Sequence, residues 1–163
     1  MMRARIERLT YVLVLSACLL VLQAPRASAQ AGPWDFNITH LGPTAVGKAD
    51  GAAMEWNITG VGLFCGGPRI NPGKINFYLS PWRISTNEVL TATVVVDGSA
   101  ADMKFRGWQD LAVTSVSADF ARRLMAARSL SVLVKDYRSP NPEVIKMDGS
   151  AFAIRRALGG CLQ

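Results

Sequence analysis

Short segments in which every second residue is apolar constrain the fold of this chain more than any other feature. The segment WDFNIT (34–39) alternates in this way, and MEWNIT (54–59) and INFYLS (75–80) repeat the pattern. A period of two places every second side chain on the same face of a β-strand. Each segment is therefore predicted to be a strand with one face on a core.

Further strands are predicted from β-branched residues and turn residues. The run VLTATVVVD (89–97) is followed after Gly98 by AADMKF (100–105). An Asp-Gly pair between two such runs predicts a hairpin, because glycine supplies the positive φ that a tight turn needs. SLSVLV (129–134) and EVIKM (143–147) are predicted as two more strands, separated by a turn rich in proline.

Two short helices are expected late in the chain. In the segment 117–128, Ser117 is a candidate N-cap and Asp119 stands in the first turn, where the helix dipole favours an anion. The segment 149–161 predicts a C-terminal helix that Gly159–Gly160 stops. The predicted fold class is mainly β with two short helices, either an antiparallel β-sandwich or a partly open β-barrel with a C-terminal helix.

Residues 1–29 have the features of a cleaved signal peptide. Three arginines precede an apolar run, residues 9–22, that is too short to span a bilayer. Ala27-Ser28-Ala29 fits the ordinary cleavage site, whereas Leu15-Ser16-Ala17-Cys18 fits a lipobox, whose cysteine would carry a lipid anchor. We favour cleavage near Ala29, which leaves residues 30–163 as a single β-rich domain in the periplasm or outside the cell.

Removal of the signal peptide changes the charge of the chain. Four of the 18 basic residues and one of the 12 acidic residues leave, so 14 minus 11 gives a mature charge of +3. This charge is weak evidence for nucleic-acid binding, and we expect no nucleic-acid partner. After residue 29 we expect no transmembrane helix.

Cleavage also leaves two cysteines, Cys65 and Cys161, in an exported chain. A disulfide is the simplest use of such a pair in an oxidising compartment. A reactive thiol or a metal ligand is the alternative, although neither cysteine has a CxxC partner or a nearby histidine.

Two glycine motifs resemble nucleotide-binding loops only in part. Gly42, Gly47 and Lys48 fit the phosphate-binding loop, but Ala49 replaces the Ser or Thr that holds magnesium. We interpret this segment as a Gly/Pro turn. Near Gly60 the third glycine of a dinucleotide motif is missing, so a bulge or a close backbone approach is expected instead. No cofactor is predicted.

No catalytic or metal site is predicted either. His40 is the single histidine, and no GxSxG motif accompanies it. The asparagines of two glycosylation sequons, Asn37 and Asn57, are interpreted as strand residues. The tryptophans are expected in the core or at its rim, with partial exposure of the two that follow turn residues, Trp82 and Trp108.

A basic face is possible if the two predicted helices lie side by side. It would bind an anionic partner, such as lipopolysaccharide, phospholipid headgroups or an acidic protein. The residues concerned are Arg122, Arg123, Arg128, Arg155 and Arg156.

The order of several segments along the chain resembles that of a known protein family. A signal peptide, the segment EWNITGVGLFC ending at Cys65, a central VVVDG and the closing DGSAFAIRRALGGC are similar to small periplasmic proteins of the invasion-associated locus B type of alphaproteobacteria. The likeness covers roughly residues 54–163. It implies a β-rich envelope protein with no known reaction, sometimes linked to host-cell entry or stress survival, and it transfers only the two cysteines.

Three functional hypotheses follow. The first is a non-catalytic exported envelope protein that binds an envelope protein, a host protein or an anionic surface component. The second is a periplasmic carrier of a small apolar ligand or lipid, because a half-open barrel can hold one. The third is a hydrolase that uses a serine and His40. The lack of converging polar groups favours the first and predicts no enzyme.

Overall fold

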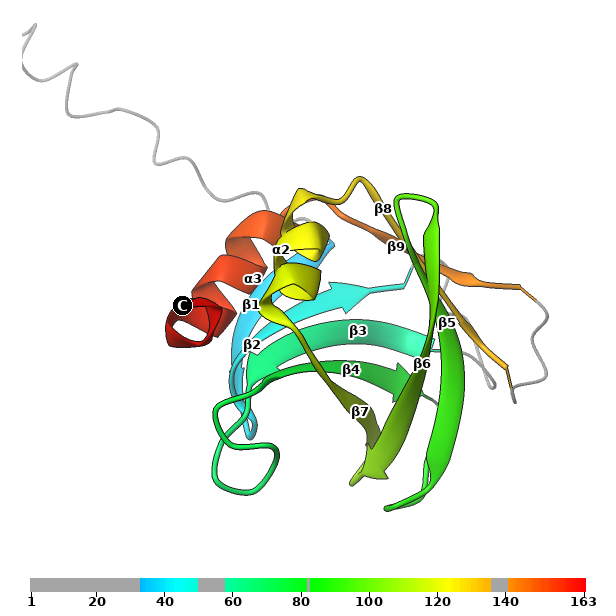
Figure 1. Cartoon of the computed structure of the whole chain (residues 1–163), viewed down its shortest axis with the longest axis horizontal. Helices are drawn as coiled ribbons and strands as arrows, with labels where there is room; N and C mark the ends of the chain where they lie inside the picture. Colours follow the sequence, from blue (N-terminus) through cyan, green and yellow to red (C-terminus); the bar gives the residue numbers. More distant parts are fainter. Residues whose placement is uncertain (1–32, 50–57, 82, 136–140) are drawn as a thin grey trace, which may run out of the picture. The chain divides into compact units, whose positions relative to one another are not determined.

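One antiparallel sheet contains all nine strands of the part of the chain that the structure describes. The computed structural model describes residues 33–49, 58–81, 83–135 and 141–163. The strand order is β1-β2-β3-β4-β7-β6-β5-β8-β9 (Figure 1). The strands are β1 (Trp34–Thr39), β2 (Gly42–Lys48), β3 (Ile58–Cys65), β4 (Ile75–Pro81), β5 (Val89–Val96), β6 (Ser99–Trp108), β7 (Leu111–Val116), β8 (Ser129–Val134) and β9 (Glu143–Lys146).

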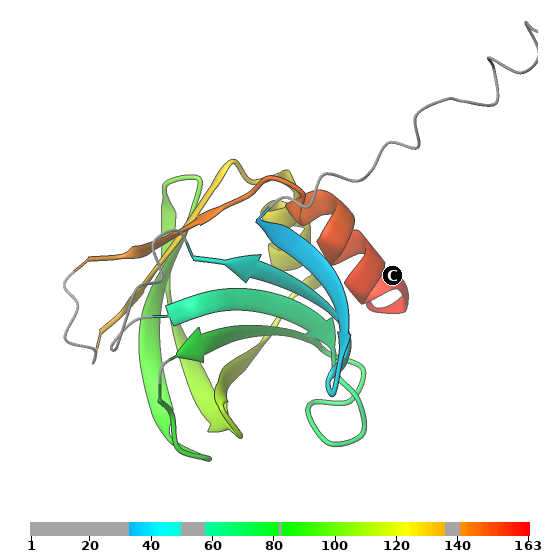
Figure 2. The same cartoon turned by 180° about the vertical axis from the view of Figure 1, so that it is seen from behind.

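The sheet curls so that its far ends approach each other. Residue Ala49, directly after β2, forms an isolated bridge with Ile145 of β9. Both views show the strands wrapping around one interior (Figures 1 and 2). The mainly β fold is therefore confirmed, and the single curled, open sheet corresponds to the predicted partly open β-barrel and not to a sandwich of two sheets.

Side chains that point inward from every second strand position form the core. In β5 every second residue, from Leu90 to Val96, is buried, and the residues between them are less so. Phe77 of β4 lies at the centre of this core, with ring centroids 5.9 Å from Phe105 and 5.4 Å from Phe120. Aromatic side chains therefore fill this part of the interior.

Two helices cover the interior, as predicted. In α2 (Ala118–Ala126) the Ser117 hydroxyl accepts a hydrogen bond from the Phe120 N–H, so Ser117 is the N-cap. The C-terminal helix α3 (Ser150–Leu158) continues into a 3₁₀ helix, η1 (Gly159–Leu162). The two helices lie side by side against the curved sheet (Figures 1 and 2).

The predicted hairpin between β5 and β6 is confirmed. Val96 pairs with Ser99, so the turn has two residues, Asp97 and Gly98, with φ of 47° and 80°. The Asp97 carboxylate accepts hydrogen bonds from the N–H groups of Arg128 and Ser129, which hold its pKa below the usual value.

The prediction of a Gly/Pro turn for the segment that begins at Gly42 is wrong, because residues 42–48 form strand β2. This strand pairs with β1 on one side and β3 on the other. Gly47 has a packing role, since a Cβ there would lie 2.5 Å from the Trp34 indole. Composition alone suggested a turn, whereas burial between two strands decided the conformation.

The glycines of β3 confirm the predicted close backbone approach. A Cβ at Gly60 would lie 2.7 Å from the Gly47 carbonyl oxygen, and one at Gly62 would lie 2.4 Å from the Tyr78 ring. The strand register also shifts between Ile58 and Gly60. Residues 54–57 of the predicted strand lie outside the described residues, as do Trp56, Asn57 and Trp82.

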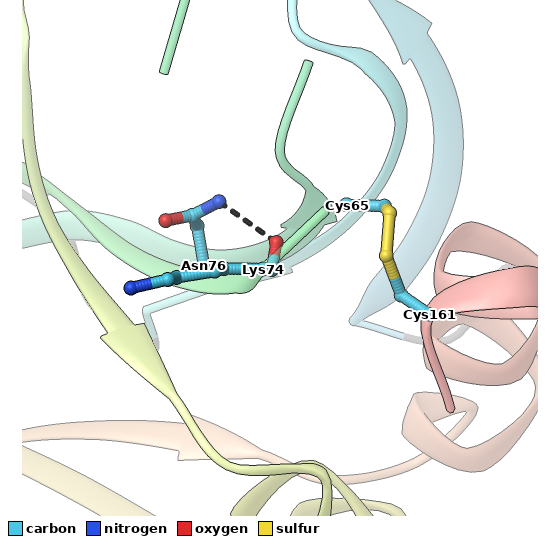
Figure 3. Close-up of a disulfide and its surroundings, with 4 residues drawn as sticks. All are labelled: Cys65, Lys74, Asn76 and Cys161. Carbon is cyan, nitrogen blue, oxygen red and sulfur yellow. Dashed lines mark hydrogen bonds between the residues drawn. A yellow bond between two sulfur atoms is a disulfide. The ribbon is translucent and has the colours of Figure 1, made fainter. Parts of the chain in front are cut away.

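A disulfide joins Cys65 at the end of β3 to Cys161 in η1, as predicted (Figure 3). Its Cα atoms are 6.0 Å apart, and the two residues are 96 positions apart in sequence. The bond fastens the C-terminus to the sheet.

The described residues belong to one compact unit, Ala31–Gln163. Within that part of the chain no helix is long and apolar enough to cross a membrane. The predicted signal peptide, residues 1–29, and Cys18 lie outside the described residues.

Candidate functional site

A second hydrophobic cluster lies on the outer face of the sheet, away from the core. It follows from alternation: Leu63, Phe77 and Ala112 point inward, so their strand neighbours point outward. Those neighbours are buried nevertheless, because half-buried side chains from three turns cover them. The buried residues are Phe64, Tyr78, Leu111 and Val113, and the covering residues are Leu41, Ile70 and Trp108.

These three turns enclose a pocket of about 800 Å³, which we call the three-turn pocket. They are the turn 40–41 between β1 and β2 with the first two residues of β2, the loop 66–74 between β3 and β4, and the turn 109–110 between β6 and β7 with Trp108, the last residue of β6. The apolar lining includes Leu41, Ile70 and Trp108. The exposed rim consists of His40, Arg69, Gln109 and Asp110.

The loop 66–74 is a folded wall of this pocket. The Gly66 N–H donates to the Lys74 carbonyl over 2.8 Å, and the Gly73 N–H donates to the Gly66 carbonyl over 3.0 Å. A Cβ at Gly66 would lie 2.0 Å from the Asn71 carbonyl oxygen, so this close approach requires glycine.

The buried side chain of Asn76 fastens the loop to the sheet. Its Oδ1 accepts a hydrogen bond from Asn71 Nδ2 over 2.7 Å and one from Ser115 Oγ over 3.3 Å. Its Nδ2 donates to the Lys74 carbonyl over 3.1 Å (Figure 3). A buried amide with these partners fixes the loop, since breaking the bonds would leave polar groups unpaired.

Threonine side chains hold the turn between β1 and β2. The Leu41 N–H donates to Thr39 Oγ1 over 3.1 Å, and the buried Thr44 hydroxyl donates to the Gly42 carbonyl over 2.9 Å. The Thr39 and Thr44 hydroxyls also contact each other at 3.0 Å. These bonds position His40 and Leu41 over the outer cluster.

The third turn presents Trp108. Its indole stacks on the His40 ring, with centroids 6.0 Å apart and planes 17° apart, and it is half-buried, as predicted from its place beside a turn. The next residue, Gln109, has a φ of 55°. This left-handed conformation costs a side-chain-bearing residue energy, and such strain concentrates at functional sites.

Below the pocket, Tyr78 lies in the outer cluster, and burial raises its pKa to about 12. The folded state therefore favours the neutral Tyr78 phenol, whereas in the unfolded chain this phenol ionises at about pH 10. Between pH 10 and 12 the unfolded chain binds fewer protons, so stability must fall as the pH rises.

We expect this fall to amount to about 3 kcal/mol for two pKa units. Urea unfolding of the wild type and of Tyr78→Phe, measured from pH 8 to pH 12, checks it. The variant should lose this part of the alkaline destabilisation. Parallel profiles for the two proteins would show that the Tyr78 hydroxyl has no special environment.

The structure places the residues singled out in the sequence in different regions. His40 and Trp108 meet in the pocket, whereas Arg69, Ile70, Gln109 and Asp110 were missed. The missed residues lie in turns, which carry no periodic signal, and they come from segments far apart in the chain. The only sequence signal for this site was the expected partial exposure of Trp108. Among the described residues, no three His, Cys, Asp or Glu side chains are grouped to hold a metal ion.

The two helices do lie side by side, but several of their arginines have partners within the chain. Arg122 donates to Asp119 over 2.8 Å and to the Leu162 carbonyl over 2.9 Å. The Arg156 guanidinium lies 4.4 Å from the centre of the Phe36 ring. The anionic-partner face, formed by Arg122, Arg123, Arg128, Arg155 and Arg156, stays a prediction.

The comparison with solved structures finds a fold neighbour. The chain is similar to the crystal structure of invasion associated protein B from Bartonella henselae, with 12% sequence identity and a TM-score of 0.53. The match covers 81% of this chain and 96% of that chain. No protein-family model and no curated protein sequence matches significantly. At this identity the similarity concerns the fold, and at that level it confirms the predicted resemblance.

Proposed function

We propose that this chain is a non-catalytic binding module of the cell envelope or the extracellular space, and that the three-turn pocket holds its partner. The observation that carries the proposal is the outer cluster with its pocket. The volume, about 800 Å³, lies within the range of about 300 to 1,000 Å³ typical of ligand sites. Trp and Arg, both present here, are enriched in binding hot spots.

Two further observations support a location outside the cytoplasm. The Cys65–Cys161 disulfide suits an oxidising compartment, and the first 29 residues have the features of a signal peptide. The fold neighbour from Bartonella is described as invasion associated. For this chain we propose contact with a component of its own envelope or of a host-cell surface.

The chemistry of the pocket supports binding rather than catalysis. None of its described lining residues carries a hydroxyl group, and the Cys65 sulfur is bonded to Cys161. The hydrolase hypothesis, a serine with His40, would need a serine beside His40 that this lining does not supply.

Sedimentation of the purified exported protein with isolated envelopes and with intact host cells tests the proposal. Trp108→Ala removes the aromatic wall, and we expect at least a tenfold weaker association, or about 1.4 kcal/mol. Val89→Ala, an exposed apolar residue outside the pocket, is the control. Gly67→Trp provides a second variant, because a Cβ there meets no atom within 4 Å and the indole would fill the pocket.

The arginine face is the competing site and is tested in parallel. Joint replacement of Arg122, Arg123, Arg155 and Arg156 by Gln removes four charges. Loss of association with this variant, but not with Gly67→Trp, would move the binding site to the helices and contradict our assignment.

The carrier hypothesis is the alternative for the same pocket, because Leu41, Ile70 and Trp108 give the pocket an apolar lining. Extraction of the purified protein with organic solvent, followed by mass spectrometry, checks it. A stoichiometric lipid that is absent from the Gly67→Trp variant would establish a carrier.

A further inference from the structure

The rim of the three-turn pocket carries both charges and both kinds of hydrogen-bonding group. Arg69 offers a fork of donors and the Asp110 carboxylate offers acceptors, while Gln109 and His40 can do both. The two formal charges cancel. All four side chains are exposed at the mouth of the pocket, where a ligand would meet them first.

The wall of the pocket adds a flat aromatic surface. The Trp108 indole is half-buried: it packs against the outer cluster, and the exposed His40 ring lies nearly parallel to it with the ring centroids 6.0 Å apart. The face of an indole carries partial negative charge and attracts the polarised C–H bonds of a ring laid on it. A pyranose has such a C–H face, and its hydroxyl groups project from its edge.

This combination of groups distinguishes between ligand classes. A hydrocarbon chain would desolvate the polar rim without giving it hydrogen-bond partners. An anion would meet the Asp110 carboxylate, and a cation would meet Arg69. A neutral ligand with paired hydroxyls satisfies donors and acceptors together, because each hydroxyl can donate one hydrogen bond and accept others.

The backbone that carries the rim is also held in place within the chain. Asn76 and the backbone bonds of Gly66 and Gly73 hold the loop that carries Arg69. The turn with Gln109 keeps a left-handed backbone between two paired strands, β6 and β7. Such preorganisation lowers the entropy lost on binding, which matters most for ligands with few apolar contacts.

We infer that the three-turn pocket binds a neutral saccharide, with a sugar ring on Trp108 and its hydroxyls bonded to Arg69 and Asp110. The inference rests on the proposed function, which assigns partner binding to this pocket. The pocket is large and open enough for a short oligosaccharide. The same chemistry is present in bacterial envelope glycans and in the neutral glycans of host cells.

A printed array of glycans tests the inference directly. It should carry neutral bacterial and neutral animal glycans as separate series, together with anionic glycans. We expect the wild type to bind members of a neutral series, which also identifies the source. Binding only to anionic glycans, or to none, would overturn the inference.

Variants locate the site on the protein. For a neutral glycan that binds, Trp108→Ala should weaken the affinity about 30-fold or more, as for a hot-spot residue. Arg69→Gln and Asp110→Asn should each weaken it about tenfold, whereas Lys104→Gln, an exposed residue of β6, should not. Saccharide binding that survives both Trp108→Ala and Gly67→Trp would place it elsewhere and overturn the inference.

Mild periodate treatment separates this inference from the proposed function. Periodate cleaves vicinal diols and leaves most protein surfaces and the lipids without such a diol intact. Pocket-dependent association with cells or envelopes should fall after treatment to the level of Gly67→Trp. Association that depends on the pocket but resists periodate would overturn the saccharide inference and leave the proposed function standing. Association that does not depend on the pocket would overturn both the inference and the proposed function.

Discussion

Removal of the Cys65–Cys161 disulfide is expected to lower the free energy of unfolding by about 4 to 5 kcal/mol. The bond closes a loop of 96 residues, and cross-linking a long loop removes much conformational freedom from the unfolded chain. It also fastens η1, where no side chain is fully buried, to the end of β3. Urea unfolding of the double variant Cys65→Ala/Cys161→Ala, compared with the oxidised wild type, measures this loss.

A reducing agent provides the control for this prediction. Reduction should destabilise the wild type by a similar amount and leave the double variant unchanged. A loss below about 1 kcal/mol in both tests would contradict the loop-entropy argument. Since Cys65 immediately precedes the wall of the three-turn pocket, binding assays with the double variant should be performed well below its unfolding transition.

The second large effect is expected from Phe77→Ala, at about 3 to 5 kcal/mol. The Phe77 side chain is fully buried on the inner face of β4 and contacts the rings of Phe105 and Phe120. Its loss would remove the contact that joins the sheet to α2 and leave a cavity that the surrounding strands can fill only in part. Chemical unfolding monitored by circular dichroism measures the change.

Phe152→Ala is the matched control, because this phenylalanine of α3 is 59% exposed. We expect a change within about 0.5 kcal/mol there. If Phe77→Ala does not fold, Phe77→Leu provides a milder test, with an expected loss of up to about 1.5 kcal/mol. Equal losses at positions 77 and 152 would contradict the assignment of the core to the inner face.

Local signals in the sequence predicted much of the secondary structure. Alternation in the segments 34–39 and 75–80, and β-branched residues in the segment 89–97, correctly predicted strands, although of these three strands only β5 alternates in burial. The Asp97–Gly98 turn and the Ser117 N-cap were also predicted, since each depends on the chemistry of one or two residues. The disulfide followed from the small number of cysteines left after cleavage.

The pairing of strands was not visible in the same way. Strand β2 was mistaken for a turn, because its glycines and proline have low strand propensity, yet β1 and β3 bond to it on both sides. Strand β7 was not predicted, and its first three residues are buried on both faces, so that they do not alternate. The order of strands across the sheet depends on long-range contacts that no local pattern encodes.

By itself, the sequence determined the two helices, the strands marked by alternation or by β-branched residues, and which two cysteines can pair. The three-turn pocket was decided only by the tertiary structure. Its residues lie in and beside three turns, at positions 40–43, 67–70 and 108–110, which meet over the outward side chains of β3, β4 and β7. Turn residues lack periodicity, and burial of an outer face depends on the loops that fold over it, so the site exists only once the chain has folded.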